Sequence, residues 1–209
     1  MSNVLSEAMR YLGCRGEPDE QTAALLERGE KALRSEVSPS YCWLEAEKSA
    51  LGDFICGNDI KKHLEGCEKA VLFAATLGAQ SERLIRRAEA ENMAYAVVLD
   101  ALASAFIEEF CDKCELEIKA RVGGNFTYRF SPGYGDYPLG LQAMFIRRLS
   151  ADKRIGLTAT SNSILIPRKS VTAIIGVSEH EIEHEKRSCA TCSMRERCVY
   201  RKEGKSCGD

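Results

Sequence analysis

The sequence has little net charge, no long apolar run and no visible export signal. Its 29 basic and 31 acidic residues leave a formal charge of −2, whereas general nucleic-acid-binding domains are usually basic. No apolar run approaches the roughly 20 residues that span a membrane. The first residues, MSNVLSEAMRYLG, lack the basic and apolar regions of a signal peptide. We therefore expect a cytoplasmic protein that binds neither nucleic acid nor membrane.

Two common nucleotide-binding glycine motifs do not fit either. Gly133-x-Gly135 has no third glycine in the dinucleotide-binding register, and no Gly-Lys-Ser/Thr follows this loop as in a phosphate loop. Histidine is scarce. The segment 180–184 (HEIEH) matches the letters of a zinc-protease motif, but it is almost wholly charged, and His63 is the third and last histidine. Nucleoside triphosphate chemistry and zinc proteolysis are therefore not expected.

Cysteine, in contrast, is abundant, with ten residues in a chain of 209. Without a secretory signal, these are expected to be reduced thiols or metal ligands and not a disulfide framework. Some are scattered singly among apolar neighbours or occur as a pair near the end of a predicted helix, which favours a packing role. These are Cys14, Cys42, Cys56, Cys67, Cys111 and Cys114.

The other four cysteines lie in a polar, highly charged segment. Their spacing is Cys189-x2-Cys192-x5-Cys198-x8-Cys207, in a stretch too short to fold alone. Four thiolates at such spacing bind zinc or an iron–sulfur cluster, and the sequence does not choose between the two. The composition change predicts a domain at 1–180 and a Cys-rich, metal-binding tail at 181–209. A disordered tail with free thiols is the alternative.

The apolar patterns predict an α+β domain, with a mixed, mostly antiparallel sheet and long helices. Helical spacing occurs at 3–12 and 19–36, and one long helical region extends from 81 to about 117. Asn58 or Asp59 is expected to cap a short helix that ends near Gly66, and another helix is expected at 139–149, just after Pro138. Strands are expected within 41–51 and at 69–77, 126–130, 155–157, 164–166 and 171–177.

One loop is unusually rich in residues that suit a ligand site. Residues 129–138 read RFSPGYGDYP. The glycines let the backbone approach a ligand, and Tyr134 and Tyr137 offer flat faces to a ring. The neighbouring Arg129 could bind a carboxylate or phosphate with two parallel hydrogen bonds. On composition alone, a connecting turn beside a surface arginine is the alternative.

This loop and a later segment resemble the activation domain of cobalamin-dependent methionine synthase. Residues 129–134 (RFSPGY) are similar to that domain's R-x-x-P-G-Y motif. Leu157-Thr158 followed by 167–173 (PRKSVTA) is similar to its L-T and P-x-x-S-V-S-G segments, and 100–106 (DALASAF) is weakly similar to a preceding helix. The family has P-G-Y-P where this chain has P-G-Y-G-D-Y-P.

The resemblance implies a methionine synthase activation domain-like fold that binds S-adenosylmethionine. In the family, this cofactor methylates a corrinoid whose cobalt has been oxidised to Co(II), with the addition of one electron. The resemblance assigns the carboxylate of S-adenosylmethionine to Arg129 and its ammonium group to Asp100. It implies that the backbone of Gly133 and the ring of Tyr134 line the cofactor. The site residues predicted from the resemblance and from the composition of the loop are Asp100, Arg129, Ser131, Gly133, Tyr134 and Tyr137.

The complete synthase carries corrinoid and substrate modules that could not fit in 209 residues. We therefore expect a stand-alone accessory subunit for reactivation of cobalamin (vitamin B12) on a separate methionine synthase or related methyltransferase. The electron would come through a tail iron–sulfur cluster or from a donor such as flavodoxin or ferredoxin. The alternatives are a regulatory module that senses S-adenosylmethionine without methyl transfer, and a metal-bound scaffold whose loop holds no ligand.

Overall fold

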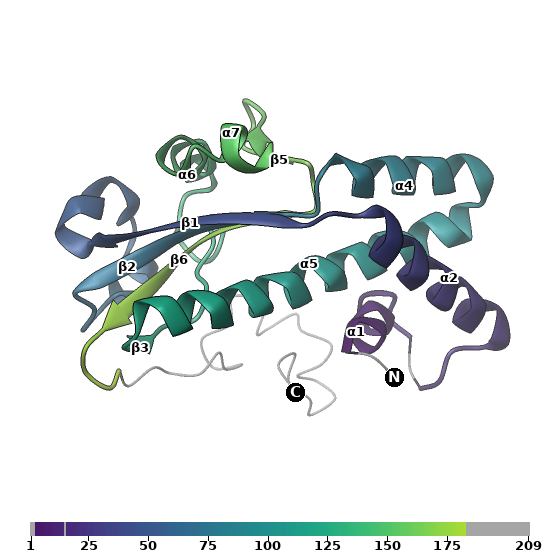
Figure 1. The fold of residues 1–209 in the computed structure, drawn as a ribbon, viewed down its shortest axis with the longest axis horizontal. Helices are drawn as coiled ribbons and strands as arrows, with labels where there is room; N and C mark the ends of the chain where they lie inside the picture. Colours follow the sequence, from purple (N-terminus) through teal and green to yellow (C-terminus); the bar gives the residue numbers. More distant parts are fainter. Residues whose placement is uncertain (1–2, 15, 183–209) are drawn as a thin grey trace.

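The fold is built around a four-stranded antiparallel sheet. A computed structural model describes residues 3–14 and 16–182, and the strand order is β1-β2-β6-β3 (Figure 1). Every neighbouring pair is antiparallel. The strands are β1 Ser40–Glu47, β2 Lys69–Thr76, β6 Ser170–Ser178 and β3 Asn125–Phe126. A separate hairpin pairs β4 (Thr158–Ala159) with β5 (Leu165–Ile166).

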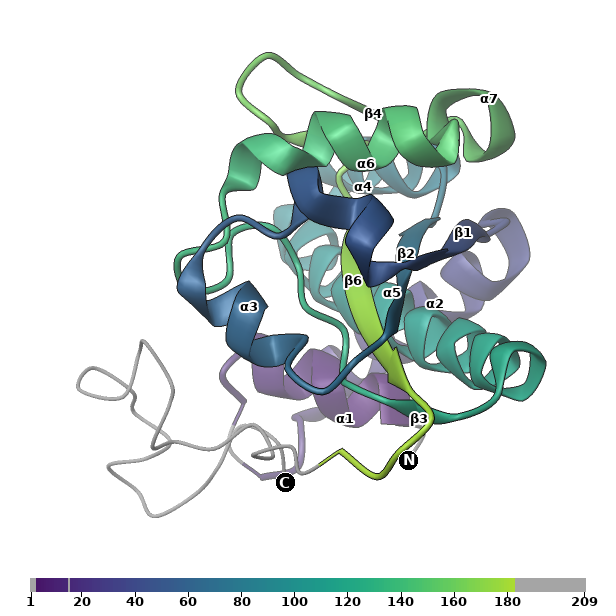
Figure 2. The ribbon, with the colours of Figure 1, turned by 90° about the vertical axis from the view of Figure 1, so that its left-hand side faces the viewer.

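Helices cover both faces of the sheet (Figures 1 and 2). On one face lies α5 (Met93–Val122), against which α1 (Asn3–Tyr11), α2 (Glu20–Glu36) and α4 (Ala79–Glu91) pack. The other face carries the remaining helices, which share a second core. These are η1 (Lys48–Phe54), α3 (Asn58–His63), η2 (Leu139–Leu141), α6 (Gln142–Leu149) and α7 (Ala151–Ile155).

The central strand β2 belongs to both cores because successive side chains point to opposite faces. Val71 and Phe73 lie in the core beneath α5, whereas Leu72 and Ala74 lie in the core beneath α6. All four are fully buried. The continuous apolar run of this strand therefore reflects burial on both faces, and the buried strand predicted at 69–77 is confirmed.

The long helical region predicted at 81–117 is two helices. Asn92 separates α4 from α5 with an extended backbone, and its side chain accepts a hydrogen bond from the backbone N–H of Tyr95 at 3.1 Å, as an N-cap does. Helix α5 continues to Val122 and buries residues on several sides, because it lies between the sheet and the outer helices. In the described part of the chain, no helix is long and apolar enough to cross a membrane.

Other sequence predictions are confirmed in part. Helix α2 begins after Asp19, whose carboxylate accepts from the N–H of Thr22 at 2.7 Å. The strand predicted at 126–130 is shorter: after β3, only an isolated bridge joins Phe130 to Ile174. The strand predicted at 155–157 is wrong, because α7 extends to Ile155 and the left-handed Gly156 follows it.

The cysteines expected to pack fall into three groups. Cys42, Cys67, Cys111 and Cys114 are buried, as expected. Burial raises the pKa of the Cys114 thiol to about 12, so this group is inert at neutral pH. Cys111 and Cys114 lie well inside α5 and not near its end. Cys14 is exposed and Cys56 is half-buried, so the packing prediction is wrong for Cys14.

The backbone of Gly176 in β6 leaves no room for a side chain. A methyl group there would meet Cys67 Sγ at 2.5 Å and Thr127 Cγ2 at 2.8 Å. Thr127 cannot rotate freely, because its Oγ1 accepts the Gly176 N–H at 2.7 Å and lies 2.8 Å from His63 Nε2. We expect Gly176→Ala to lower the free energy of unfolding in urea by about 1–3 kcal/mol. Gly140→Ala, with open space around it, is the control, and equal effects of the two substitutions would contradict this packing.

Candidate functional site

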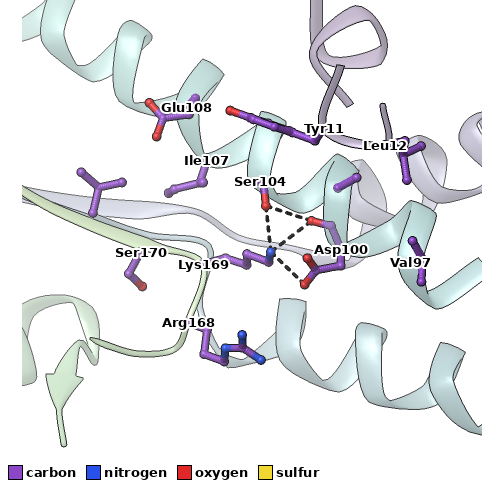
Figure 3. Close-up of a pocket in the computed structure, with 12 residues that line it drawn as sticks. Tyr11, Leu12, Val97, Asp100, Ser104, Ile107, Glu108, Arg168, Lys169 and Ser170 are labelled. Carbon is purple, nitrogen blue, oxygen red and sulfur yellow. Dashed lines mark hydrogen bonds and ion pairs between the residues drawn. The ribbon is translucent and has the colours of Figure 1, made fainter. Parts of the chain in front are cut away.

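A cavity of about 490 Å³ lies between α5, the end of α1 and the segment that leads into β6 (Figure 3). Its size is typical of small-molecule sites. The apolar part of its wall comes from Leu12, Val97, Ala101, Ile107 and Val171. Its polar part comes from Tyr11, Asp100, Ser104, Glu108, Arg168, Lys169 and Ser170. The cavity therefore suits a ligand with both apolar and charged parts.

Lys169 connects the two main walls of the cavity (Figure 3). Its Nζ lies 2.8 Å from Asp100 Oδ1, 2.8 Å from Ser104 Oγ and 3.1 Å from the carbonyl oxygen of Asp100. The lysine side chain is only 13% exposed. Three acceptors match the three donors of an ammonium group, so the Lys169 amine is satisfied and neutralises Asp100.

Further hydrogen bonds hold the segment before β6 in place. The N–H of Arg168 donates to Glu82 Oε1 at 2.7 Å, and the N–H of Leu77 donates to the carbonyl oxygen of Lys169 at 2.9 Å. Ser170 Oγ lies 2.7 Å from Thr76 Oγ1. Backbone bonds of this kind fix the positions from which the neighbouring side chains extend.

Arg129 lies in contact with three carboxylates of α5. Its guanidinium nitrogens are 2.7 Å from Glu115, 2.7 Å from Asp112 and 3.2 Å from Glu108. Burial by itself would lower the pKa of Arg129, but the hydrogen bond to Asp112 and the neighbouring negative charges raise it above its usual value. A ligand carboxylate at this guanidinium would have to compete with these three carboxylates.

The loop after Arg129 is held by a reciprocal pair of aspartates. Asp136 accepts hydrogen bonds from the N–H groups of Asn58 at 2.6 Å and Asp59 at 3.0 Å, while Asp59 accepts the N–H of Asp136 at 3.0 Å. Gly135 has φ of 51°, and a Cβ there would collide with the Asp59 carboxylate. Asp136, not Asn58 or Asp59 as predicted, supplies the carboxylate at the start of α3.

The two loop tyrosines lie in different surroundings. Tyr134 is 45% exposed and packs edge-on against Phe130, with ring centroids 5.8 Å apart. Tyr137 is buried in the core beneath α6, and its hydroxyl has no hydrogen-bond partner in the described residues. Burial raises the pKa of Tyr137. Tyr134 can therefore offer a ring face to a ligand, whereas Tyr137 packs in the core.

The predicted site residues are brought together only in part. Asp100 lines the cavity. Glu108, which also lines it, accepts a hydrogen bond from Arg129 and so places that arginine beside the cavity. Burial raises the pKa of Tyr11 above its ordinary value, and the Arg10 guanidinium partly offsets this shift. Ser131, Gly133 and Tyr137 are not among the lining residues.

Several residues that line the site were not predicted from the sequence. Three of them lie inside the segments 100–106 and 167–173 of the resemblance, although no role was predicted for them: Ser104, Arg168 and Lys169. Two others lie outside all of these segments: Tyr11 and Glu108. One local signal was present: Glu108, Asp112 and Glu115 recur at helical spacing, which places three carboxylates on one face of α5. No group of three possible metal ligands gathers anywhere in residues 3–14 and 16–182. The tail cysteines 189, 192, 198 and 207 lie outside the described residues.

A comparison with solved structures shows what the fold resembles. Protein-family profiles and curated protein sequences gave no match. The crystal structure of the MetH reactivation domain bound to AdoHcy (S-adenosylhomocysteine) matches with a TM-score of 0.59 and 14% sequence identity. The match covers 98% of this chain and 85% of that one. The predicted activation-domain-like α+β fold is thus confirmed.

Asp136→Ala should loosen the loop that follows Arg129. Hydrogen bonds from Asn58 and Asp59 hold the pKa of Asp136 below its ordinary value of 3.8. The carboxylate is therefore charged at neutral pH, and the contact is lost only as the pH falls through this lowered pKa. We expect several-fold faster amide hydrogen exchange at 131–138 and at the start of α3 in the variant at neutral pH. Asp152→Ala on α7 is the control, and unchanged exchange in the loop would rule out this role.

Proposed function

We propose that the chain binds S-adenosylmethionine in the cavity beside α5. One observation supports this most: residue 100 and residues 168–171, which belong to two separate segments of the resemblance, line the same cavity. The third segment, at 129–134, adjoins the cavity through the Arg129–Glu108 contact. A related fold has been crystallised with AdoHcy, which is S-adenosylmethionine without its methyl group.

We further propose that the bound cofactor reactivates a corrinoid on a separate protein. The partner would be a cobalamin-dependent methionine synthase or a related methyltransferase with its cobalt as Co(II). In this reaction one electron and the methyl group of S-adenosylmethionine go to cobalt, and S-adenosylhomocysteine is released. The chain would act as an accessory subunit, with the electron supplied by its tail or by a donor such as flavodoxin or ferredoxin.

The cavity residues suit orientation and not acid–base catalysis. The sulfonium of S-adenosylmethionine is already activated, so the protein needs to hold the methyl group toward its acceptor. Tyr11 and the exposed Val97 offer a ring face and an apolar surface to the adenosine. Lys169 keeps the wall formed by Asp100 and Ser104 rigid. The carboxylate assignment of Arg129 stays a prediction, because that guanidinium already contacts three carboxylates.

The tail at 181–209 is proposed, from its sequence, to bind a metal through Cys189, Cys192, Cys198 and Cys207. An iron–sulfur cluster there could pass the electron that the corrinoid needs. A zinc ion has no redox role and would shape a docking surface.

Blocking the cavity should abolish ligand binding. Val97 is 53% exposed and lines the cavity, whereas Met93, one turn earlier on α5, is 64% exposed and does not. We expect the unaltered protein and Met93→Arg to bind S-adenosylmethionine alike in calorimetric titrations. Val97→Arg should bind at least about tenfold more weakly, because the new side chain fills ligand space.

Two results would separate the candidate functions. Loss of binding in both arginine variants, or in neither, would contradict the proposed site. Binding that does not accelerate methylation of a Co(II) corrinoid protein, with a chemical reductant present, would favour the sensing module over the reactivation subunit.

Metal analysis tests the tail. Protein purified without oxygen should contain either zinc or iron with acid-labile sulfide, and the double substitution of Cys189 and Cys192 by serine should remove it. Cys14→Ser, which changes an exposed thiol of the main domain, should retain the metal. Zinc would exclude the tail as electron donor, and protein without metal would exclude the metal site.

A further inference from the structure

We propose that Arg168 binds the carboxylate of the ligand's amino-acid end, an inference that rests on the proposed binding of S-adenosylmethionine. Arg168 is one of the residues that line the cavity, and Figure 3 shows its side chain there. An arginine binds a carboxylate through two parallel hydrogen bonds, so a single side chain can fix both the position and the orientation of that group.

The charges around the cavity favour this assignment. Lys169 is satisfied by Asp100 and Ser104, and Arg129 is shared among three carboxylates. The guanidinium of Arg168 has no ion pair or hydrogen bond in the described part of the chain, and Figure 3 draws it without a dashed line. Arg168 is therefore the lining cation that can accept an anionic group without displacing another one.

The backbone of Arg168 is well placed to act as an anchor. Its N–H is bound to Glu82 of α4, and the next residue is tied to α5 through the Lys169 amine. The carbonyl oxygen of Lys169 also accepts a bond from Leu77. Because this backbone is already fixed, only the side chain of Arg168 has to become ordered when a ligand binds. The entropic cost of binding at this residue is therefore small.

A zwitterionic amino-acid end fits the neighbouring groups. Lys169 contacts Oδ1 and the backbone oxygen of Asp100, but no described residue bonds to Oδ2 of this half-exposed carboxylate. An ammonium group of the ligand could bind there, as the resemblance implies, while the adjacent carboxylate meets Arg168. The adenosine would then extend over Val97 toward Tyr11.

Two ligands that differ only in the carboxylate test this assignment. We expect Arg168→Gln to weaken the binding of S-adenosylmethionine by roughly 10- to 100-fold, the effect of losing a charge-assisted contact. Decarboxylated S-adenosylmethionine should bind the variant and the unaltered protein with equal affinity. Arg168→Lys keeps the positive charge but loses the paired hydrogen-bond geometry. Its affinity for S-adenosylmethionine should therefore lie between those of the unaltered protein and Arg168→Gln.

Arg129→Gln measured with the same two ligands is the comparison. The Arg168 assignment is overturned if Arg168→Gln leaves S-adenosylmethionine affinity unchanged or weakens both ligands equally. It is also overturned if the carboxylate-dependent loss appears in Arg129→Gln instead. In each of these cases the proposed function survives. If neither ligand binds the unaltered protein, the proposed function fails, and the Arg168 assignment fails with it. Unchanged circular dichroism would show that the exposed substitution at 168 leaves the fold intact.

Discussion

The central strands of the sheet are apolar on both faces, and this constraint governs the rest of the structure. β2 and β6 bury nearly every side chain along their length. A sheet of this kind must be covered on both sides. The cover on one side is α5, whose 30 residues extend along the sheet and pack against α1, α2 and α4. The position of α5 in turn determines where a cavity can form.

The cavity forms where apolar packing gives way to charge. Along α5, fully buried residues such as Leu99 and Leu102 alternate with Asp100, Ser104 and Glu108 on another side of the helix. The strand β6 begins opposite these polar residues, and Lys169 joins the two elements just before the strand. The same helix thus supplies a core and one wall of a polar site. Cavity walls fixed in this way suit a protein that holds a ligand in one orientation.

The sequence predicted those features that depend on local patterns. The strand β2 and the helix α2 were readable because burial and helical spacing leave marks in a short run of residues. The break at Asn92 was missed because a single capping residue within a helix-rich stretch is a weak signal. Contacts such as Lys169 with Asp100 join residues 69 positions apart and follow from topology, which a single sequence does not reveal. The resemblance identified the segments of the site, but not which charges within them were already paired.

A crystal structure with S-adenosylhomocysteine would show directly where the ligand binds. We predict ligand density in the cavity between α1, α5 and the segment before β6, with the adenosine against Val97 and the amino-acid end beside Asp100 and Arg168. Density for the ligand at another surface, with this cavity empty, would contradict it.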